Sequence, residues 1–355
     1  MPRITPSISA LCVALLLLAA SAARGETIDA LAGRPDAWPA SDEGRRVLDN
    51  VVSWQQPSGG WWKAYDVRTA PPDDAAPAHD GRSTFDNDAT WSELRLLARA
   101  VTLVGDARHR AAFDRGLRAT LDSQYANGGF PQRFPPPPDY GRHVTFNDDA
   151  MTNVLRLLRD VAAGESPFAF VDHAVREEAA DAFDRGIACI LSAQVVIDGK
   201  PTVWCAQHDA DTLAPAAARS YELPSLSGGE SADVVLLLMS IDEPSDAVKD
   251  AVVAAIDWYE RAKLTGVRLE RFDDADAPRG FDVRLVADAD APPLWGRFYD
   301  LDTGRVFFAD RDGVKVDSLD QIGVERRTGY AWLRPFGAKL LAAYPVWAER
   351  HGIDG

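Results

Sequence analysis

Residues 84–97 read Thr-Phe-Asp-Asn-Asp-Ala-Thr-Trp-Ser-Glu-Leu-Arg-Leu-Leu, and residues 145–158 nearly repeat them as Thr-Phe-Asn-Asp-Asp-Ala-Met-Thr-Asn-Val-Leu-Arg-Leu-Leu. Each copy opens with three oxygen-bearing side chains and continues into the apolar spacing of an amphipathic helix. One such triplet is typical of a helix cap, which needs a single side-chain oxygen. Both copies supply two carboxylates and an amide. This repeated excess indicates a site where two helix starts converge on one cation or one sugar.

A second motif recurs ahead of each polar triplet. Residues 55–63 read Gln-Gln-Pro-Ser-Gly-Gly-Trp-Trp-Lys and residues 124–133 read Gln-Tyr-Ala-Asn-Gly-Gly-Phe-Pro-Gln-Arg, while a degenerate third copy runs from Gln194 to Trp204. The copies are about 70 residues apart, which is long enough for a helical hairpin with its loops. The sequence therefore predicts a mostly α-helical fold, a partial α/α toroid of about three helical hairpins whose repeated loops share one end.

The pattern along the chain predicts several further elements. The expected helices cover residues 41–56, 174–194, 228–241, 245–263 and 335–350. Residues 294–300 and 305–308 resemble two short strands of a hairpin, joined at Leu301–Gly304. Strand and helix do not alternate regularly, which excludes a parallel α/β sheet. The strands near the C-terminus are expected to be an appendix to the helical domain.

The aromatic residues of the glycine turns, Trp61, Trp62 and Phe130, admit two interpretations. Exposed rings beside a flexible turn are the platforms on which sugar-binding clefts hold their ligands. The same rings can instead form a lid over the hydrophobic core. The glycines need no function, because glycine supplies the left-handed residue that ends many helices.

The composition describes a large exported protein. The 355 residues are 46% apolar and carry a net charge of −16, which argues against nucleic-acid binding because that requires a basic face. Residues 1–24 have the features of a signal peptide, with Arg3 followed by an apolar core and small residues at the cleavage site. No other segment is apolar enough for a membrane. We expect a secreted or periplasmic monomer with one catalytic domain over residues 25–355.

The candidate ligands favour a hard cation. Carboxylate and amide oxygens suit Ca²⁺ or Mg²⁺, and the chain lacks the cysteine and histidine spacings that hold zinc or copper. Cys189 and Cys205 remain after signal cleavage, and their spacing leaves a disulfide and two buried thiols equally open. Arginine forks suit carboxylates or phosphates. A cation together with several arginines indicates a polyanionic substrate whose charges are carboxylates.

The ordered motifs resemble one known family. Thr-Phe-Asp-Asn-Asp-Ala-Thr, Asn-Gly-Gly-Phe-Pro-Gln, Thr-Phe-Asn-Asp-Asp-Ala-Met, Ala-Arg-Ser-Tyr-Glu-Leu-Pro-Ser, and Arg-Phe-Tyr-Asp with Glu-Arg-Arg-Thr-Gly-Tyr-Ala-Trp follow one another over nearly the whole mature chain. Together they resemble the pectate lyases of polysaccharide lyase family 10. The resemblance implies a partial α/α toroid that cleaves polygalacturonate with Ca²⁺.

The resemblance also implies roles for matching residues. It assigns the catalytic centre to Asp86 and Arg219, with Arg219 as the base. Asn87 and Asp148 would hold the calcium ion that bridges enzyme and uronate. The residues expected to bind substrate carboxylates are arginines: Arg297, Arg305 and one of Arg326 and Arg327. The degenerate third turn, and Phe130 where the family has a tryptophan-like residue, are departures that affect the aromatic platforms.

The implied reaction is a β-elimination. A base removes the C5 proton beside the uronate carboxylate and O4 of the next sugar leaves, while cations neutralise the charge that develops. Arginine is too basic to be neutral at ordinary pH. An arginine base needs either a pKa lowered by neighbouring Ca²⁺ and cations or a high ambient pH, so we predict an alkaline optimum. The alternative for Arg219 is a structural ion pair with Glu222.

Two other functions fit part of the pattern. An inverting glycoside hydrolase on an α/α toroid would use Asp86 and Asp148 as acid and base, but leaves the arginines without a role. A non-catalytic exported pectin- or Ca²⁺-binding module would bind polygalacturonate and release no product. Absorbance of the unsaturated uronate separates these functions from a lyase.

Overall fold

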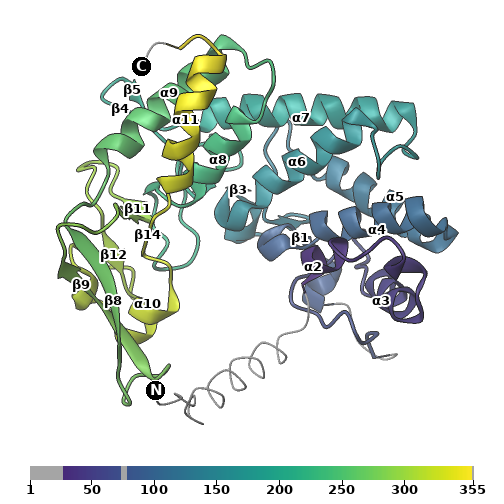
Figure 1. Cartoon of the computed structure of the whole chain (residues 1–355), viewed down its shortest axis with the longest axis horizontal. Helices are drawn as coiled ribbons and strands as arrows, with labels where there is room; N and C mark the ends of the chain where they lie inside the picture. The colour runs from purple at the N-terminus through teal and green to yellow at the C-terminus, as the bar shows by residue number, and fades with distance from the viewer. Residues whose placement is uncertain (1–26, 73–77, 354–355) are drawn as a thin grey trace, which may run out of the picture.

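The computed structural model describes residues 27–72 and 78–353 (Figure 1). The predicted signal peptide, residues 1–24, lies outside them. Most of the regular structure is helical, which confirms the predicted class. The helices are α2 (Ile28–Ala32), α3 (Asp42–Ser53), α4 (Trp91–Val104), α5 (Ala107–Asp122), α6 (Ala150–Ala163), α7 (His173–Ala193), α8 (Glu230–Met239), α9 (Asp246–Arg261), α10 (Val324–Gly329) and α11 (Ala338–Arg350). The five helices expected from the sequence are all present, with ends within a few residues.

The long helices form hairpins in two layers. Helix α4 packs on α5, α6 on α7 and α8 on α9, and the hairpins contact one another through α4, α6 and α8 on one side and through α5, α7 and α9 on the other. A left-handed glycine ends two of these helices: Gly105 (φ 75°) follows α4 and Gly164 (φ 66°) follows α6. The side chain of Asp106 then caps α5. Helix α11 covers α8 and α9.

A glutamine marks the same place in each repeat. The side-chain amides of Gln55, Gln124 and Gln194 each donate to a carbonyl of their own turn and to a carbonyl of a neighbouring helix. The second acceptors are Ala112 in α5, Ala182 in α7 and Ala251 in α9. These paired bonds join each turn to the next outer helix. The third copy, degenerate in sequence, keeps this contact.

The aromatic residues of the turns belong mainly to the core. Trp61 and Phe130 are 0% exposed, so of the two interpretations the exposed platform is wrong for both and the ring over the core is the one observed. The indole of Trp61 donates to the carbonyl of Val51 in the preceding helix, at 2.7 Å. Trp62 is half-buried and stacks on His79, with ring centroids 3.6 Å apart. The rings that follow the double glycine therefore pack the turn against the hydrophobic core.

The strands are short and cluster near the C-terminal end of the chain. They are β1 (Ser83–Thr84), β2 (Arg133–Phe134), β3 (Val144–Thr145), β4 (Val196–Ile197), β5 (Lys200–Pro201), β6 (Gln207–His208), β7 (Leu226–Ser227), β8 (Val267–Asp273), β9 (Phe281–Ala287), β10 (Trp295–Gly296), β11 (Phe298–Tyr299), β12 (Phe308–Ala309), β13 (Lys315–Val316) and β14 (Leu333–Arg334). Figure 1 shows β8–β14 and α10 on one side of the molecule and α3–α7 on the other. A second, smaller core cluster, which includes Phe298, Phe308 and Trp332, lies beneath these strands.

The predicted hairpin of residues 294–308 needs correction. Only one bridge, Tyr299 to Val306, joins its two arms. Strand β10 instead pairs with β14, and β11 pairs with β7, both antiparallel. The C-terminal segment is thereby connected to the start of α8, so that Arg297 lies beside the helical loops. The longest hairpin, β8–β9, was not predicted.

Two other expectations concern chemistry outside the site. Cys189 and Cys205 are both buried and free, so the disulfide alternative is wrong. Burial raises the pKa of the Cys189 thiol to about 12. Within residues 27–72 and 78–353, no helix has both the length and the apolar character needed to cross a membrane.

Candidate active site

The two polar triplets occupy equivalent loops. Residues Asp86–Asp88 and Asn147–Asp149 form short 3-10 turns that follow β1 and β3 and precede α4 and α6. Strand β1 pairs with β2, and β3 pairs with β6, so each triplet is held at a strand end. The two turns contact each other. The sequence repeat is therefore also a spatial repeat.

The backbone conformation repeats as well. Asn87 (φ 49°, ψ 53°) and Asp148 (φ 50°, ψ 38°), the middle residues of the triplets, are both left-handed. Asp88 and Asp149, which follow them, also have positive φ. Non-glycine residues rarely adopt this conformation, and Asn and Asp tolerate it best.

The helix-cap interpretation of the triplets is wrong in this structure. Among the described residues, the N-cap positions of α4 and α6 make no side-chain capping hydrogen bond. The loop before α4 is held instead by the buried Thr90, whose hydroxyl accepts from the Trp61 amide at 3.0 Å and donates to the Thr84 carbonyl at 2.9 Å. The carboxylates of the triplets are left for other contacts.

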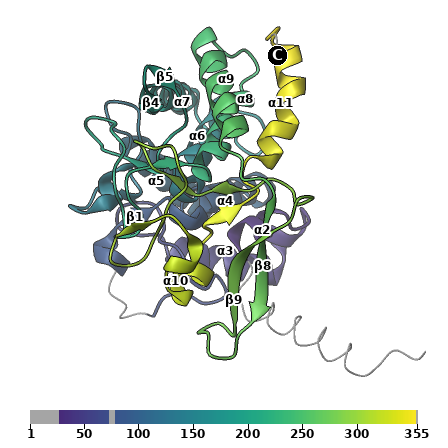
Figure 2. The same cartoon turned by 90° about the vertical axis from the view of Figure 1, so that its left-hand side faces the viewer.

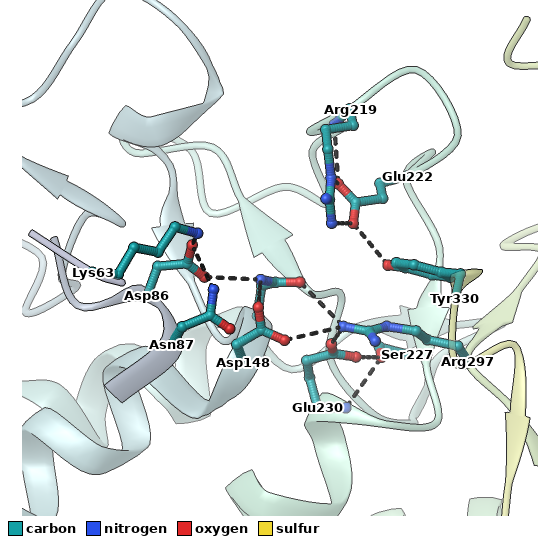
Figure 3. A network of polar contacts seen from close by, with 11 residues as sticks. Lys63, Asp86, Asn87, Asp148, Arg219, Glu222, Ser227, Glu230, Arg297 and Tyr330 are labelled. Atoms are coloured by element: carbon teal, nitrogen blue, oxygen red, sulfur yellow. Dashed lines mark hydrogen bonds and ion pairs between the residues drawn. The ribbon is translucent and has the colours of Figure 1, made fainter. Parts of the chain in front are cut away.

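The triplets meet through their side chains (Figure 3). The amide nitrogen Nδ2 of Asn147 lies 2.9 Å from Asp148 Oδ2 and 3.5 Å from Asp86 Oδ1. Asn87 Nδ2 lies 3.4 Å from Asp86 Oδ2. The ammonium of Lys63, from the Gly-Gly-Trp-Trp-Lys turn, pairs with the buried Asp86. Asp86, Asn87 and Asp148, all expected at the site, form one cluster.

Arg297 joins the cluster from the C-terminal segment. Its Nη2 lies 3.2 Å from Asn147 Oδ1 and 3.7 Å from Asp148 Oδ1, and it forms an ion pair with Glu230 at the start of α8. The hydroxyl of Ser227 also donates to Glu230. The Nε of Arg297 is buried and has no hydrogen-bond partner among the described residues. Such an orphaned donor costs free energy unless a ligand binds it.

The crowding of carboxylates changes their acidity. Burial raises the pKa of Asp148 to about 6, and repulsion from Asp86 adds to this effect, whereas Arg297 opposes it. Burial also raises the pKa of Asp149 to about 7, with further contributions from Asp233 and Glu230. Negative charge at this cluster is therefore unfavourable until a cation neutralises it.

Arg219 and the cluster residue Arg297 both contact the ring of Tyr330. The guanidinium carbon of Arg219 is 5.8 Å from the centroid of Tyr330, and that of Arg297 is 4.7 Å from the same centroid. Arg219 also forms the ion pair with Glu222 that was its alternative role, with Nε 2.7 Å from Oε2. This hydrogen bond raises the pKa of Arg219, although burial opposes the rise. The protein groups around Arg219 therefore raise its pKa, and the alkaline optimum stays a prediction.

The remaining predicted arginines are placed differently. Arg326 is buried, pairs with Glu325 and lies over the Tyr221 ring at 4.5 Å. Arg327 turns to Asp282, with Nε 2.8 Å from Oδ1. Arg305 is exposed and has no ion-pair partner among the described residues.

Comparison with known proteins now adds to the geometry. Residues 55–341 match the family described as pectic acid lyase. The chain belongs to the pectic acid lyase family. This range holds every predicted site residue, and membership identifies the chain as a pectate lyase, a polysaccharide lyase.

Two solved structures resemble this pectic acid lyase. One is a family 10 polysaccharide lyase from Cellvibrio cellulosa, with 34% sequence identity and a TM-score of 0.75, covering 93% of this chain and 99% of its own. The other is an aspartate-to-alanine mutant of a family 10 polysaccharide lyase from Cellvibrio cellulosa in complex with trigalacturonic acid, with 34% identity and a TM-score of 0.76. It covers 91% of this chain and 99% of its own. No curated protein matches the sequence.

Three members of the cluster had no predicted role. Lys63 and Glu230 were not among the predicted site residues, and Asn147 was part of the predicted triplet but was given no role of its own. Their role depends on which charges they meet, and only the fold shows that Lys63 faces Asp86 and that Glu230 faces Arg297. In this pectic acid lyase, a lysine and an arginine therefore flank the two acidic loops.

Proposed function

We propose that this pectate lyase cleaves polygalacturonate by Ca²⁺-dependent β-elimination, releasing unsaturated oligogalacturonates. The observation that carries the proposal is the meeting of Asp86 and Asp148 with Arg297 in one cluster, with Arg219 across the Tyr330 ring. A uronate polymer needs such an arrangement, because its carboxylates must be neutralised before the C5 proton becomes acidic.

The residues of the cluster fit a calcium ion. Asp86, Asn87 and Asp148 would hold it with hard oxygen donors, and the raised pKa of Asp148 reflects a negative charge that a dication would relieve. Within residues 27–72 and 78–353, no three His, Cys, Asp or Glu side chains are already arranged as a metal site. A substrate carboxylate would thus complete the ligand set. Bound there, calcium would neutralise the uronate and make its C5 proton more acidic.

The chain's own residues would orient and deprotonate the sugar. Arg297 would bind a uronate carboxylate, because Glu230 holds its guanidinium in place and its Nε has no hydrogen-bond partner among the described residues. Lys63 would hold Asp86 in place. Arg219, exposed over 45% of its side chain, would take the C5 proton. Arg305 and Arg326 remain proposed carboxylate ligands. Arg326 is favoured over Arg327 because its guanidinium carbon lies 5.8 Å from the centroid of the Tyr330 ring, which Arg219 and Arg297 also contact.

The state of Arg219 determines the pH dependence. As a base it must lose a proton, and its hydrogen bond with Glu222 keeps its pKa above the ordinary value. We therefore propose an alkaline optimum. Export through residues 1–24, a monomeric state and a partial α/α toroid also belong to the proposal, the last supported by the two layers of helical hairpins.

A glycoside hydrolase fits the geometry less well. An inverting hydrolase separates its two carboxyl groups by about 6.5–9.5 Å to admit a water molecule. Asp86 and Asp148 instead contact the same amide nitrogen of Asn147. This arrangement resembles a cation site more than an acid–base pair.

The test is an absorbance assay on polygalacturonate between pH 7 and pH 11, with Ca²⁺ and with a chelator. We expect an absorbing unsaturated product that disappears on chelation and returns with Ca²⁺. Arg219→Ala should abolish turnover and largely retain binding. Reducing ends without absorbance would indicate a hydrolase, and binding without any product would indicate a non-catalytic module.

A further inference from the structure

A separate pocket lies beside the unpredicted hairpin β8–β9. It has a volume of about 360 Å³ and is bounded by one face of the hairpin, by α10 and by β14. Figure 2 shows the hairpin projecting next to α10. The lining contains four arginines, Arg271, Arg279, Arg327 and Arg334, and no acidic residue. This concentration of positive charge contrasts with the chain as a whole, whose net charge is −16.

The register of the hairpin separates two kinds of arginine. Arg271 lies opposite Val283, on the face that lines the pocket. Arg268 and Arg284 alternate with Arg271 and Val283 along their strands, so they point to the opposite face, where both pair with Glu270. The exposed Arg271 has no carboxylate partner among the described residues. Of these three hairpin arginines, the two on the outer face are paired with a carboxylate and Arg271 is not.

Three of the four pocket arginines are positioned without a carboxylate partner, whereas Arg327 pairs with Asp282. The guanidinium of Arg271 lies 3.7 Å from the centroid of the Phe281 ring. Arg279 Nη1 lies 3.3 Å from the carbonyl oxygen of Thr328, which ties the hairpin loop to α10. Arg279 and Arg334 are exposed and, within the described ranges, have no ion-pair partner. Three guanidinium groups thus present free donors at one pocket, an arrangement that suits a carboxylate-bearing ligand.

Tyr330 connects this pocket to the candidate active site. It lines the pocket, while its hydroxyl donates to Glu222 Oε1 at 2.7 Å and its ring lies between Arg219 and Arg297. Tyr330 therefore belongs both to the pocket lining and to the group of rings and guanidinium groups beside the candidate active site. We propose that the pocket of Arg271, Arg279 and Arg334 binds uronate residues of polygalacturonate beyond those at the cleaved bond. This inference rests on the proposed function and extends it to substrate length.

The variant Arg271→Gln/Arg334→Gln tests the inference, because both side chains are exposed and carry no ion pair that folding needs. We expect KM for polygalacturonate to rise about tenfold, because two exposed charge pairs are lost, with kcat on trigalacturonate unchanged. The matched control is Arg284→Gln on the outer face of the same hairpin, where Arg268 still neutralises Glu270. The control should bind both substrates as the wild type does.

Binding measured by calorimetry separates this inference from the proposed reaction. If the wild type binds polygalacturonate but forms no unsaturated product, the reaction is wrong, and weaker binding by the double variant still supports the pocket. Unchanged affinity of the double variant for the polymer overturns the inference. Equal weakening by Arg284→Gln overturns it too, since this would show a general effect of charge. A matching loss on trigalacturonate would move these arginines to the central site and likewise overturn it.

Discussion

The ion pair between Arg297 and Glu230 allows a quantitative prediction. The two side chains are 12% and 4% exposed, and Ser227 is the other side chain that donates to Glu230. Arg297→Met leaves the Glu230 carboxylate buried without its countercharge. Breaking a buried pair in this way typically costs about 3–5 kcal/mol. We therefore expect the free energy of unfolding to fall by about 4 kcal/mol.

The double variant Arg297→Met/Glu230→Gln makes the prediction specific. Neutralising the unpaired carboxylate of residue 230 removes most of this penalty. The free energy of unfolding of the double variant should therefore be about 2 kcal/mol higher than the value obtained by adding the losses of the two single variants. Urea unfolding at pH 8, followed by tryptophan fluorescence, measures all four proteins. Additive losses would refute the reasoning, because they would mean that the two groups do not interact. Product formation should be lost in Arg297→Met and not be restored in the double variant, since Asn147 and Asp148 still lack their guanidinium partner.

The remaining predictions concern a buried acid, the candidate base and a repeat contact. Burial raises the pKa of Glu93 from 4.5 to about 7, so wild-type stability should fall by about 3 kcal/mol between pH 4.5 and pH 8 through this group. Urea unfolding should show that the stability of Glu93→Gln does not fall over this pH range. The fall should be larger in Tyr65→Phe, because the hydrogen bond from Tyr65 lowers the pKa of Glu93. Identical dependence of stability on pH in the three proteins would contradict this prediction. Glu222→Gln should move the rising limb of the kcat profile to lower pH, since Glu222 raises the pKa of Arg219; an unshifted limb would remove Arg219 as the titrating base. Gln124→Leu should lower the free energy of unfolding by about 2 kcal/mol, because the carbonyls of a turn and of α7 lose their donor, and an unchanged urea midpoint would contradict this.

The helical part of the fold could be predicted because its signals are local. Apolar spacing, Gly105 and the cap at Asp106 lie within single segments, so each helix could be placed without knowledge of its partners. The strands could not be placed in this way. Trp295 pairs with Arg334 and Phe298 with Ser227, contacts between distant parts of the chain that two-residue strands do not encode. The strands of the hairpin β8–β9 alternate apolar and polar residues, but the long connection between them lacks the sequence motif of a tight turn.

The candidate site was predicted in part. Asp86 and Asp148 were found because the motif occurs twice, and their proximity followed from the repeat. The ion pair of Arg219 with Glu222 was predicted only as an alternative role, because the contact that raises the pKa of Arg219 and the burial that opposes the rise both depend on tertiary structure. The place of Trp61 was left open for a similar reason: a tryptophan after a double glycine has the same sequence whether it faces solvent or the core.

The left-handed backbone at Asn87 and Asp148 affects how substitutions there can be interpreted. A β-branched or bulky side chain at either position would be strained in this backbone conformation, independently of any role of the side-chain oxygen in binding the ion. Loss of activity in a valine variant would thus have two possible causes, a distorted loop and a missing ligand, that the experiment could not tell apart. Glycine removes the side-chain oxygen and adopts the left-handed conformation without strain, so a glycine variant measures the loss of the ligand without distortion of the loop. For the same reason, natural exchange at these two positions should be confined to asparagine, aspartate and glycine.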